Sequence, residues 1–208
     1  MFKEIIWDFD GTLFDTYPGI VYTYKHALDE LGIEEDEEAI LELLKRSAKE
    51  AIEYYRDTYK LDDSFIHLIK KHKETEIDMA KPFPYAEEVC RRIAESGRRN
   101  YILTHRGYTT QELLQQYNME DLFTEIITGH SGFKRKPDPE GYAYLVDKYN
   151  MKKEEVLIVG DRELEILAAK ALGVKVCLYD TNKIKYIEKP DYVVTSLQEV
   201  KDIIMNGQ

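Results

Sequence analysis

The chain has 208 residues, of which 43% are hydrophobic and 33% are charged, as expected for a globular protein with one sizeable core or a core domain carrying a small insertion. Its 29 basic and 40 acidic residues give a net charge of −11, which argues against general binding to nucleic acid or to an anionic membrane surface. The sequence has no apolar run as long as a membrane span and no signal-peptide pattern at its N-terminus, so we expect a cytoplasmic protein.

The first predicted element is a buried strand over residues 2–7, and two acidic residues, Asp8 and Asp10, follow at its carboxyl end. At strand spacing both carboxylates point to the same side, and Gly11 lets backbone N–H groups come close to an anion. In an open α/β sheet, ligands bind at this end of the strands. Two carboxylates this close repel each other, and a Mg²⁺ ion that bridges them to a phosphate would relieve the repulsion.

Residues 16–81 show helical periodicity and no strand pattern. Start and stop signals divide the segment into four predicted helices, namely one from Pro18 to the stop at Gly32, one capped by Asp36, one starting at the capping box of residues 47–50, and one capped by Asp62 or Asp63. We therefore predict an all-helical domain inserted after the first strand.

From residue 82 onward, strands alternate with helices. The predicted strands are 100–103, 125–128, 156–159, 174–178 and 192–195, and the helices are 87–95, 110–117, 142–149, one around Ala168 and 198–204. This alternation predicts an α/β fold with a doubly wound parallel sheet. The predicted domains are an α/β core of residues 1–15 and 82–208 and a helical cap of residues 16–81. Cys90 and Cys177 lie in apolar patterns, which predicts buried thiols and neither a disulfide nor a metal site.

Four motifs, in order along nearly the whole chain, resemble those of the haloacid dehalogenase-like (HAD) superfamily of phosphohydrolases. They are Asp8-Phe9-Asp10-Gly11-Thr12, which looks like DxDGT; Thr104 after an apolar strand; Lys136 before Pro137; and Gly160-Asp161 with Glu165, which resembles GDxxxD. Glu165 departs from the pattern, because Asp is usual there. The insertion site is similar to that of the helical C1-type cap in phosphoglycolate phosphatase-like and β-phosphoglucomutase-like members.

The resemblance implies a Mg²⁺-dependent phosphohydrolase that acts on a small phosphorylated metabolite. Asp8 would be the nucleophile that forms an aspartyl-phosphate, and Asp10 would protonate the leaving group and then accept a proton from water. Lys136 would keep Asp8 ionised and offset charge on the phosphoryl group.

The same resemblance assigns the groups that hold phosphate and metal. The phosphate would be held by the Thr104 hydroxyl, the N–H of His105, and Gly11 and Thr12. The Mg²⁺ ion would be held by Asp8, the Asp10 backbone carbonyl and Asp161. Glu165 would either bind the metal through water or orient Lys136.

Several residues keep two interpretations. His105 and Arg106 belong either to the rim of the active site or to an exposed helix start. In the cap, Lys45, Arg46 and Lys49 surround the turn between two helices. They form a solvated charge cluster, which is the favoured interpretation, or they contact the substrate.

Three other functions remain as alternatives. A sugar-phosphate mutase would keep all four motifs, a phosphonate hydrolase would need a cap lysine such as Lys45 or Lys49 for a Schiff base, and a non-catalytic binding module would be expected to break a motif. Asp10 argues against a haloacid dehalogenase, whose chemistry does not need this carboxylate. We expect a monomer or a homodimer with no nucleic-acid or membrane partner. The sequence does not identify the metabolite.

Overall fold

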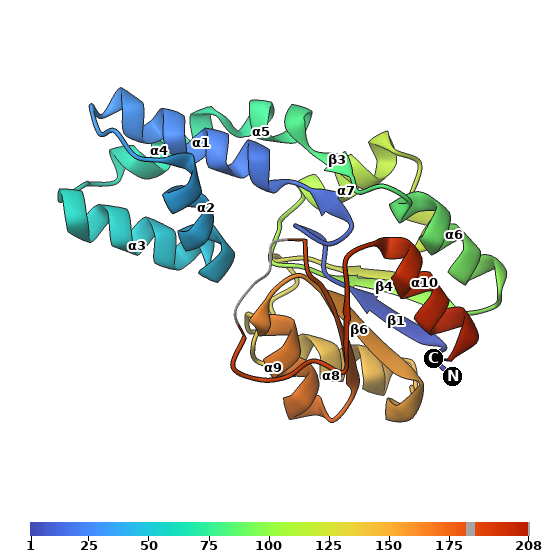
Figure 1. Cartoon of the computed structure of the whole chain (residues 1–208). Coiled ribbons are helices and arrows are strands. Elements are labelled where there is room, and N and C mark those ends of the chain that lie inside the picture. Colours follow the sequence, from blue (N-terminus) through green and yellow to red (C-terminus); the bar gives the residue numbers. More distant parts are fainter. Residues whose placement is uncertain (182–185, 208) are drawn as a thin grey trace. The chain divides into compact units, whose positions relative to one another are not determined.

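The structure, a computed structural model, describes residues 1–181 and 186–207, and the chain divides into two compact units (Figure 1). The core unit contains Met1–Phe14 and Pro82–Gln208, and the helical unit contains Asp15–Lys81. Two further strands, β2 (Phe14–Asp15) and β3 (Lys81–Pro82), form a separate two-stranded sheet. Strands of two residues are too short to produce a sequence pattern, and this pair was not predicted.

The described part of the core unit is built on a six-stranded sheet in the order β5-β4-β1-β6-β7-β8, and its paired strands are all parallel. The strands are β1 (Glu4–Trp7), β4 (Arg99–Leu103), β5 (Glu125–Ile127), β6 (Val156–Gly160), β7 (Lys175–Tyr179) and β8 (Tyr192–Val194). The first strand lies in the middle of the sheet, with β4 on one side and β6 on the other. The predicted doubly wound parallel sheet is confirmed.

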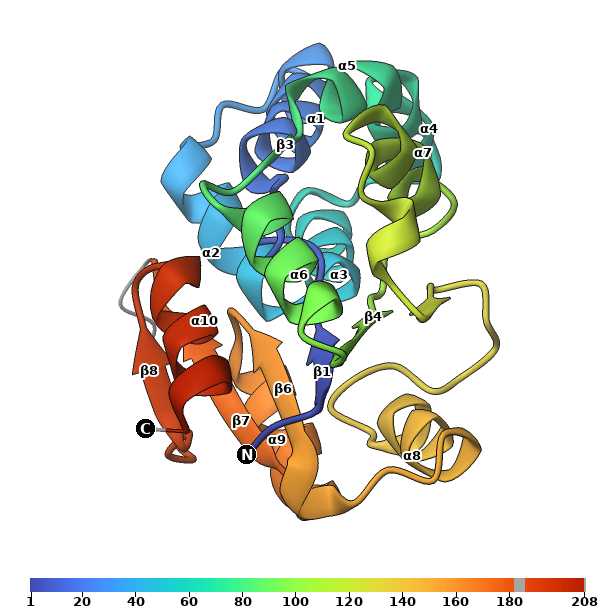
Figure 2. The same ribbon diagram turned by 90° about the vertical axis from the view of Figure 1, so that its right-hand side faces the viewer.

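Helices cover both faces of this sheet (Figures 1 and 2). One face carries α6 (Ala86–Glu95) and α10 (Leu197–Asn206), and the other carries α8 (Glu140–Lys148) and α9 (Glu163–Leu172). The helix α7 (Thr109–Gln116) and the short helices η1 (Glu120–Leu122) and η2 (Lys153–Glu155) lie in the connections. Apolar side chains such as Ile6, Ile158 and Ile166 fill the layer beneath α8 and α9. Because both faces are covered, the central strands are apolar without alternation.

The core contains both cysteines and a buried asparagine that is hydrogen-bonded to the first strand. Cys90 and Cys177 are buried and free, as predicted. Asn100 is buried and accepts a hydrogen bond from Trp7 Nε1 at 3.0 Å, while its amide donates to the Cys90 carbonyl at 2.8 Å. These bonds fix the chain directly before Asp8.

The helical unit contains α1 (Tyr17–Glu30), α2 (Glu37–Arg46), α3 (Ala48–Tyr59), α4 (Ser64–Lys71) and α5 (Lys73–Met79). Its own apolar cluster includes Leu28, Ile40 and Phe65. The fifth helix was not predicted, because its short polar sequence shows no apolar period. Ser47 caps α3 by accepting from the N–H groups of Lys49 and Glu50, both at 3.1 Å.

In the part of the chain that the structure describes, none of the helices combines the length and the apolar character needed to cross a membrane.

Candidate active site

The register of the three central strands brings the predicted site residues to one edge of the sheet. Trp7 at the end of β1 is paired with Ile102 of β4 and with Val159 of β6. Asp8, Thr104 and Asp161 each follow directly after one of these strands. Residues almost 100 and more than 150 positions apart in the sequence therefore meet where ligands bind in such sheets.

A tight turn shapes the chain after Asp8. The Phe9 carbonyl accepts from the N–H groups of Leu13 at 3.1 Å and Phe14 at 3.0 Å, and Gly11 has a φ of 77°, which favours glycine. The Gly11 N–H donates to the Phe14 carbonyl at 2.8 Å, so this residue forms the turn. Contact of Gly11 and Thr12 with a phosphate stays a prediction.

Lys136 holds Asp8 through a buried ion pair. Lys136 Nζ lies 2.7 Å from Asp8 Oδ1, and both side chains are 1% exposed. Burial works to raise the pKa of Asp8, but the charges of Lys136 and Arg162 outweigh it and hold the pKa below its ordinary value. The carboxylate is therefore kept ionised, as a nucleophile requires.

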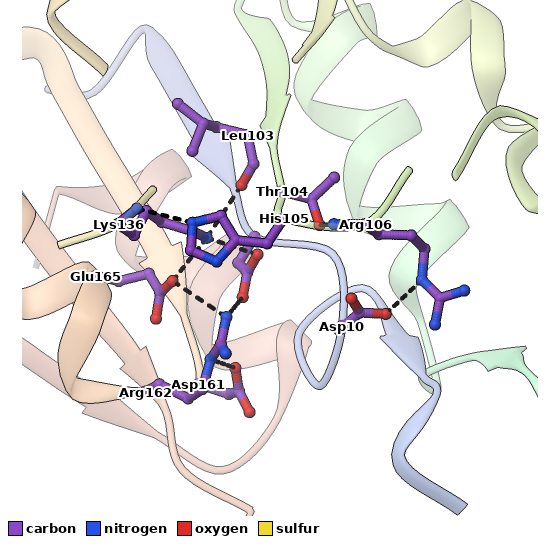
Figure 3. A network of polar contacts seen from close by, with 10 residues as sticks. Asp10, Leu103, Thr104, His105, Arg106, Lys136, Asp161, Arg162 and Glu165 are labelled. Carbon is purple, nitrogen blue, oxygen red and sulfur yellow. Dashed lines mark hydrogen bonds and ion pairs between the residues drawn. The ribbon is translucent and has the colours of Figure 1, made fainter. Parts of the chain in front are cut away.

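The same lysine is shared with Glu165 from the first turn of α9 (Figure 3). Lys136 Nζ lies 2.7 Å from Glu165 Oε1 and donates to the Leu103 carbonyl at 3.1 Å. Burial works to lower the pKa of Lys136, but Asp8 and Glu165 outweigh it, so the pKa lies above its ordinary value. Gly160 makes room for the longer side chain at this position, because a Cβ there would lie 2.3 Å from Glu165 Cγ. Of the two roles predicted for Glu165, this geometry fits the orientation of Lys136.

His105 anchors the segment that carries Lys136. The Lys136 backbone N–H donates to His105 Nε2 at 2.7 Å, so this nitrogen is an acceptor and the proton of the neutral ring is on Nδ1. Burial and then the charges of Lys136 and Arg135 lower the pKa of His105 to about 3. The predicted contact of the His105 N–H with phosphate is a separate matter and stays a prediction.

Replacing His105 by Asn is expected to weaken the dependence of stability on acid pH. In the unfolded chain His105 titrates near its ordinary pKa of about 6.5, so between there and about pH 3 the unfolded state binds the extra proton and stability falls as the pH falls. Asn keeps an acceptor without a titrating group. The wild type should lose up to about 1.4 kcal/mol more than the variant for each pH unit within this window. Urea unfolding in EDTA, followed by the fluorescence of Trp7, measures both slopes, and equal slopes would contradict the assignment.

Asp10 faces a different cation. Arg106 Nε donates to Asp10 Oδ1 at 2.7 Å, and the Arg106 side chain is almost completely buried (Figure 3). The Arg106 N–H donates to Thr104 Oγ1 at 3.0 Å, which leaves the hydroxyl proton of Thr104 available to an acceptor such as a phosphoryl oxygen. Of the two interpretations of Arg106, the exposed helix start is wrong.

Three buried carboxylates fit a divalent metal ion. Asp8, Asp161 and Glu165 each offer an oxygen, and these oxygens lie within 4.8 Å of one another. Oxygen ligands of this kind suit Mg²⁺. The Asp10 side chain is directed at Arg106. Contact of the Asp10 backbone carbonyl with the metal stays a prediction.

Two nearby residues were not predicted as part of the site. Arg162 Nη2 donates to Asp8 Oδ2 at 3.2 Å. The second residue is the buried Tyr142 on α8. Burial raises its pKa, and the charge of Glu165 raises it further, while the charge of Lys136 works to lower it. The position of Arg162 directly after Asp161 was a usable signal. For Tyr142 the sequence showed only a helix face.

In the helical unit, Arg46 and Lys49 are both exposed, and Lys49 Nζ lies 3.6 Å from Glu53 Oε1. Lys45 Nζ lies over the ring of Tyr17, 5.3 Å from its centroid. Substrate contact by Arg46 or Lys49 stays a prediction.

Comparison with known proteins gives consistent matches. Residues 5–179 match the family model for haloacid dehalogenase-like hydrolases. A phosphoglycolate phosphatase from Vibrio vulnificus is 24% identical over 98% of this chain and 96% of its own length. The pyrophosphatase PpaX from Halalkalibacterium halodurans is 26% identical over 97% of this chain and 96% of its own length. A solved structure of a hydrolase from Streptococcus pneumoniae is 30% identical, with a TM-score of 0.66, and covers 97% of this chain and 99% of its own.

Proposed function

Because the chain belongs to the haloacid dehalogenase-like hydrolase family, we propose that it is a Mg²⁺-dependent phosphatase that releases phosphate from a small phosphorylated metabolite through an aspartyl-phosphate on Asp8. The observation that carries the proposal is the buried ion pair between Asp8 and Lys136 at the carboxyl edge of the sheet. A lysine that is also paired with Glu165 has little freedom to move, so it keeps one Asp8 oxygen fixed and ionised.

Asp8 would attack the phosphorus atom of the substrate. A bond forms between an Asp8 oxygen and phosphorus while the bond from phosphorus to the leaving oxygen breaks, and water then hydrolyses the aspartyl-phosphate. This replaces one difficult displacement with two easier ones. Lys136 and the Thr104 hydroxyl would stabilise the charge on the phosphoryl oxygens.

Asp10 would move the protons. It would donate a proton to the leaving oxygen in the first step and accept one from the attacking water in the second. Arg106 fixes the Asp10 carboxylate through the 2.7 Å hydrogen bond, so it acts as a positioning residue for this transfer.

Asp8, Asp161 and the Asp10 backbone carbonyl would hold the Mg²⁺ ion, with Glu165 close by. When bound, the ion would neutralise phosphoryl charge and orient the phosphate for in-line attack.

The names of two relatives support the proposed class of substrate. Proteins named phosphoglycolate phosphatase and pyrophosphatase resemble this chain over almost its full length, and both act on small anionic phosphates by name. We therefore propose a small phosphorylated metabolite with a second anionic group.

A panel of phosphate-release assays tests the proposal. Phosphoglycolate, pyrophosphate, p-nitrophenyl phosphate and sugar phosphates are each offered with Mg²⁺ and with EDTA. We expect release from at least one of them that needs Mg²⁺ and that is fastest for a substrate with two anionic groups. Interconversion of sugar-phosphate isomers under a bisphosphate primer would identify a mutase instead, and no release from any substrate would contradict the proposal.

A further inference from the structure

We propose that the guanidinium of Arg162 occupies the cation position among Asp8, Asp161 and Glu165, and that a divalent metal ion binds there by displacing it. Arg162 would thus set the metal affinity of the site. This inference rests on the proposed function, because it assumes that Asp8 and Asp161 bind metal with Glu165 close by.

The position of the guanidinium carries the inference (Figure 3). Arg162 Nη2 lies 3.2 Å from Asp8 Oδ2 and 3.8 Å from Glu165 Oε1, and Arg162 Nε lies 3.6 Å from Asp161 Oδ1. These are the three carboxylates whose oxygens come within 4.8 Å of one another. The Arg162 side chain is 12% exposed, so it is held among them and not in solvent.

The backbone fixes this arrangement. Arg162 is the N-cap residue of α9 and has extended dihedral angles, φ −132° and ψ 164°, between the end of β6 and the first helical turn. Both flanking elements are anchored in the sheet and its covering layer. A planar guanidinium presents several N–H groups in a fixed fork, so one side chain can face carboxylates on more than one side.

Charge balance indicates that metal and guanidinium exclude each other. Fully ionised, Asp8, Asp161 and Glu165 carry three negative charges, of which Lys136 offsets one. Arg162 offsets a second, whereas Mg²⁺ would offset both that remain. With the ion in place, Arg162 would be a surplus positive charge a few ångströms from a divalent cation, which is strongly unfavourable in a buried site.

A simple structural ion pair would have a different consequence. If Arg162 served stability alone, its removal would weaken the fold and leave metal binding unchanged or weaker. If it competes with the metal, its removal must strengthen metal binding.

Calorimetric titration of Mg²⁺ into the substrate-free protein separates these outcomes. In Arg162→Gln and Arg162→Ala we expect the Kd for Mg²⁺ to fall about tenfold or more, because a like charge next to the ion is removed. Arg162→Lys keeps the positive charge but lacks the planar guanidinium, so its Kd for Mg²⁺ should lie between the values of these two variants and that of the wild type. Arg91→Gln removes the same charge from the exposed face of α6 and should leave the Kd unchanged. Circular dichroism confirms that each variant is folded.

Refilling the site gives a second test. In Arg162→Ala, millimolar guanidinium chloride should weaken Mg²⁺ binding more than an equal concentration of sodium chloride, since the free cation can re-enter the position. The wild type should respond equally to both salts. An equal response in the variant would overturn the proposal.

Asp161→Asn separates failure of this inference from failure of the proposed function. Mg²⁺ binding in the wild type that is lost in Asp161→Asn supports the metal site itself. With that result in hand, unchanged or weaker Mg²⁺ binding in Arg162→Gln and Arg162→Ala would overturn only the competition. An absence of Mg²⁺ binding in every variant would overturn both.

Discussion

Replacing Asp8 by Asn is expected to lower phosphate release at least about 10⁴-fold, because removal of a nucleophile that works with its neighbours as a unit disables the whole reaction. Asn has nearly the same shape, so Lys136 keeps its contacts with Glu165 and the Leu103 carbonyl. The fold should therefore survive. Phosphate release under saturating Mg²⁺ measures the loss, and urea unfolding confirms that the variant is folded.

A matched control is available on α8. Asp147 is an exposed aspartate, and Asp147→Asn should release phosphate at the wild-type rate. Rapid quenching followed by mass spectrometry should locate a phosphoryl group on the peptide that contains Asp8 in the wild type. Release that survives in Asp8→Asn would mean a different nucleophile.

Replacing Lys136 by Met is expected to have the largest effect on stability and a large effect on activity. The variant leaves Asp8 and Glu165 buried without the lysine that faces both, and breaking a buried ion pair in this way costs about 3–5 kcal/mol. Phosphate release should fall by about 10³-fold, because a fixed positive charge next to the phosphoryl group is lost. Urea unfolding with Trp7 fluorescence and the phosphate assay measure the two effects.

A second substitution separates these effects. Adding Glu165→Gln to Lys136→Met removes one of the two buried negative charges that Lys136 faced. The double variant should therefore recover part of the stability and none of the activity. Lys134→Met serves as the control, because Lys134 is exposed and should change stability by less than about 0.5 kcal/mol. A Lys136→Met variant as stable as the wild type would show that the ion pair is unimportant for the fold.

Most of the architecture followed from the sequence because apolar runs and helical periods are strong local signals. The strands on either side of β1 and the helices that cover them were predicted near their observed positions. The helix α5 and the pair of β2 with β3 were missed, since each is too short for a period to develop. Strand order was not predicted either, because pairing partners are set by long-range contacts.

The sequence predicted several of the residues at the site but not which side chains contact one another. The motifs named Asp8, Lys136 and Asp161, and the structure brings these side chains to one edge of the sheet. The sequence did not predict the ion pair of Arg106 with Asp10 or the contact of Arg162 with Asp8, because both depend on where the ends of long side chains lie. His105 illustrates the limit: contact of its N–H with phosphate stays a prediction, and the sequence did not predict that its ring accepts a hydrogen bond from the Lys136 backbone N–H.

The central place of β1 in the sheet has a consequence for protein synthesis. This strand leaves the ribosome before both of its neighbours, yet Ile6 pairs with Tyr101 of β4 and with Ile158 of β6. At roughly 5–20 residues per second, the second partner emerges on the order of 10 s later. During this interval Ile5, Ile6 and Trp7 have no sheet to enter, and the nascent chain depends on other protection against aggregation. The nucleophile Asp8 is made well before Lys136 and Arg162, the two cations that keep it ionised. The nascent chain is therefore expected to be inactive until its sheet closes.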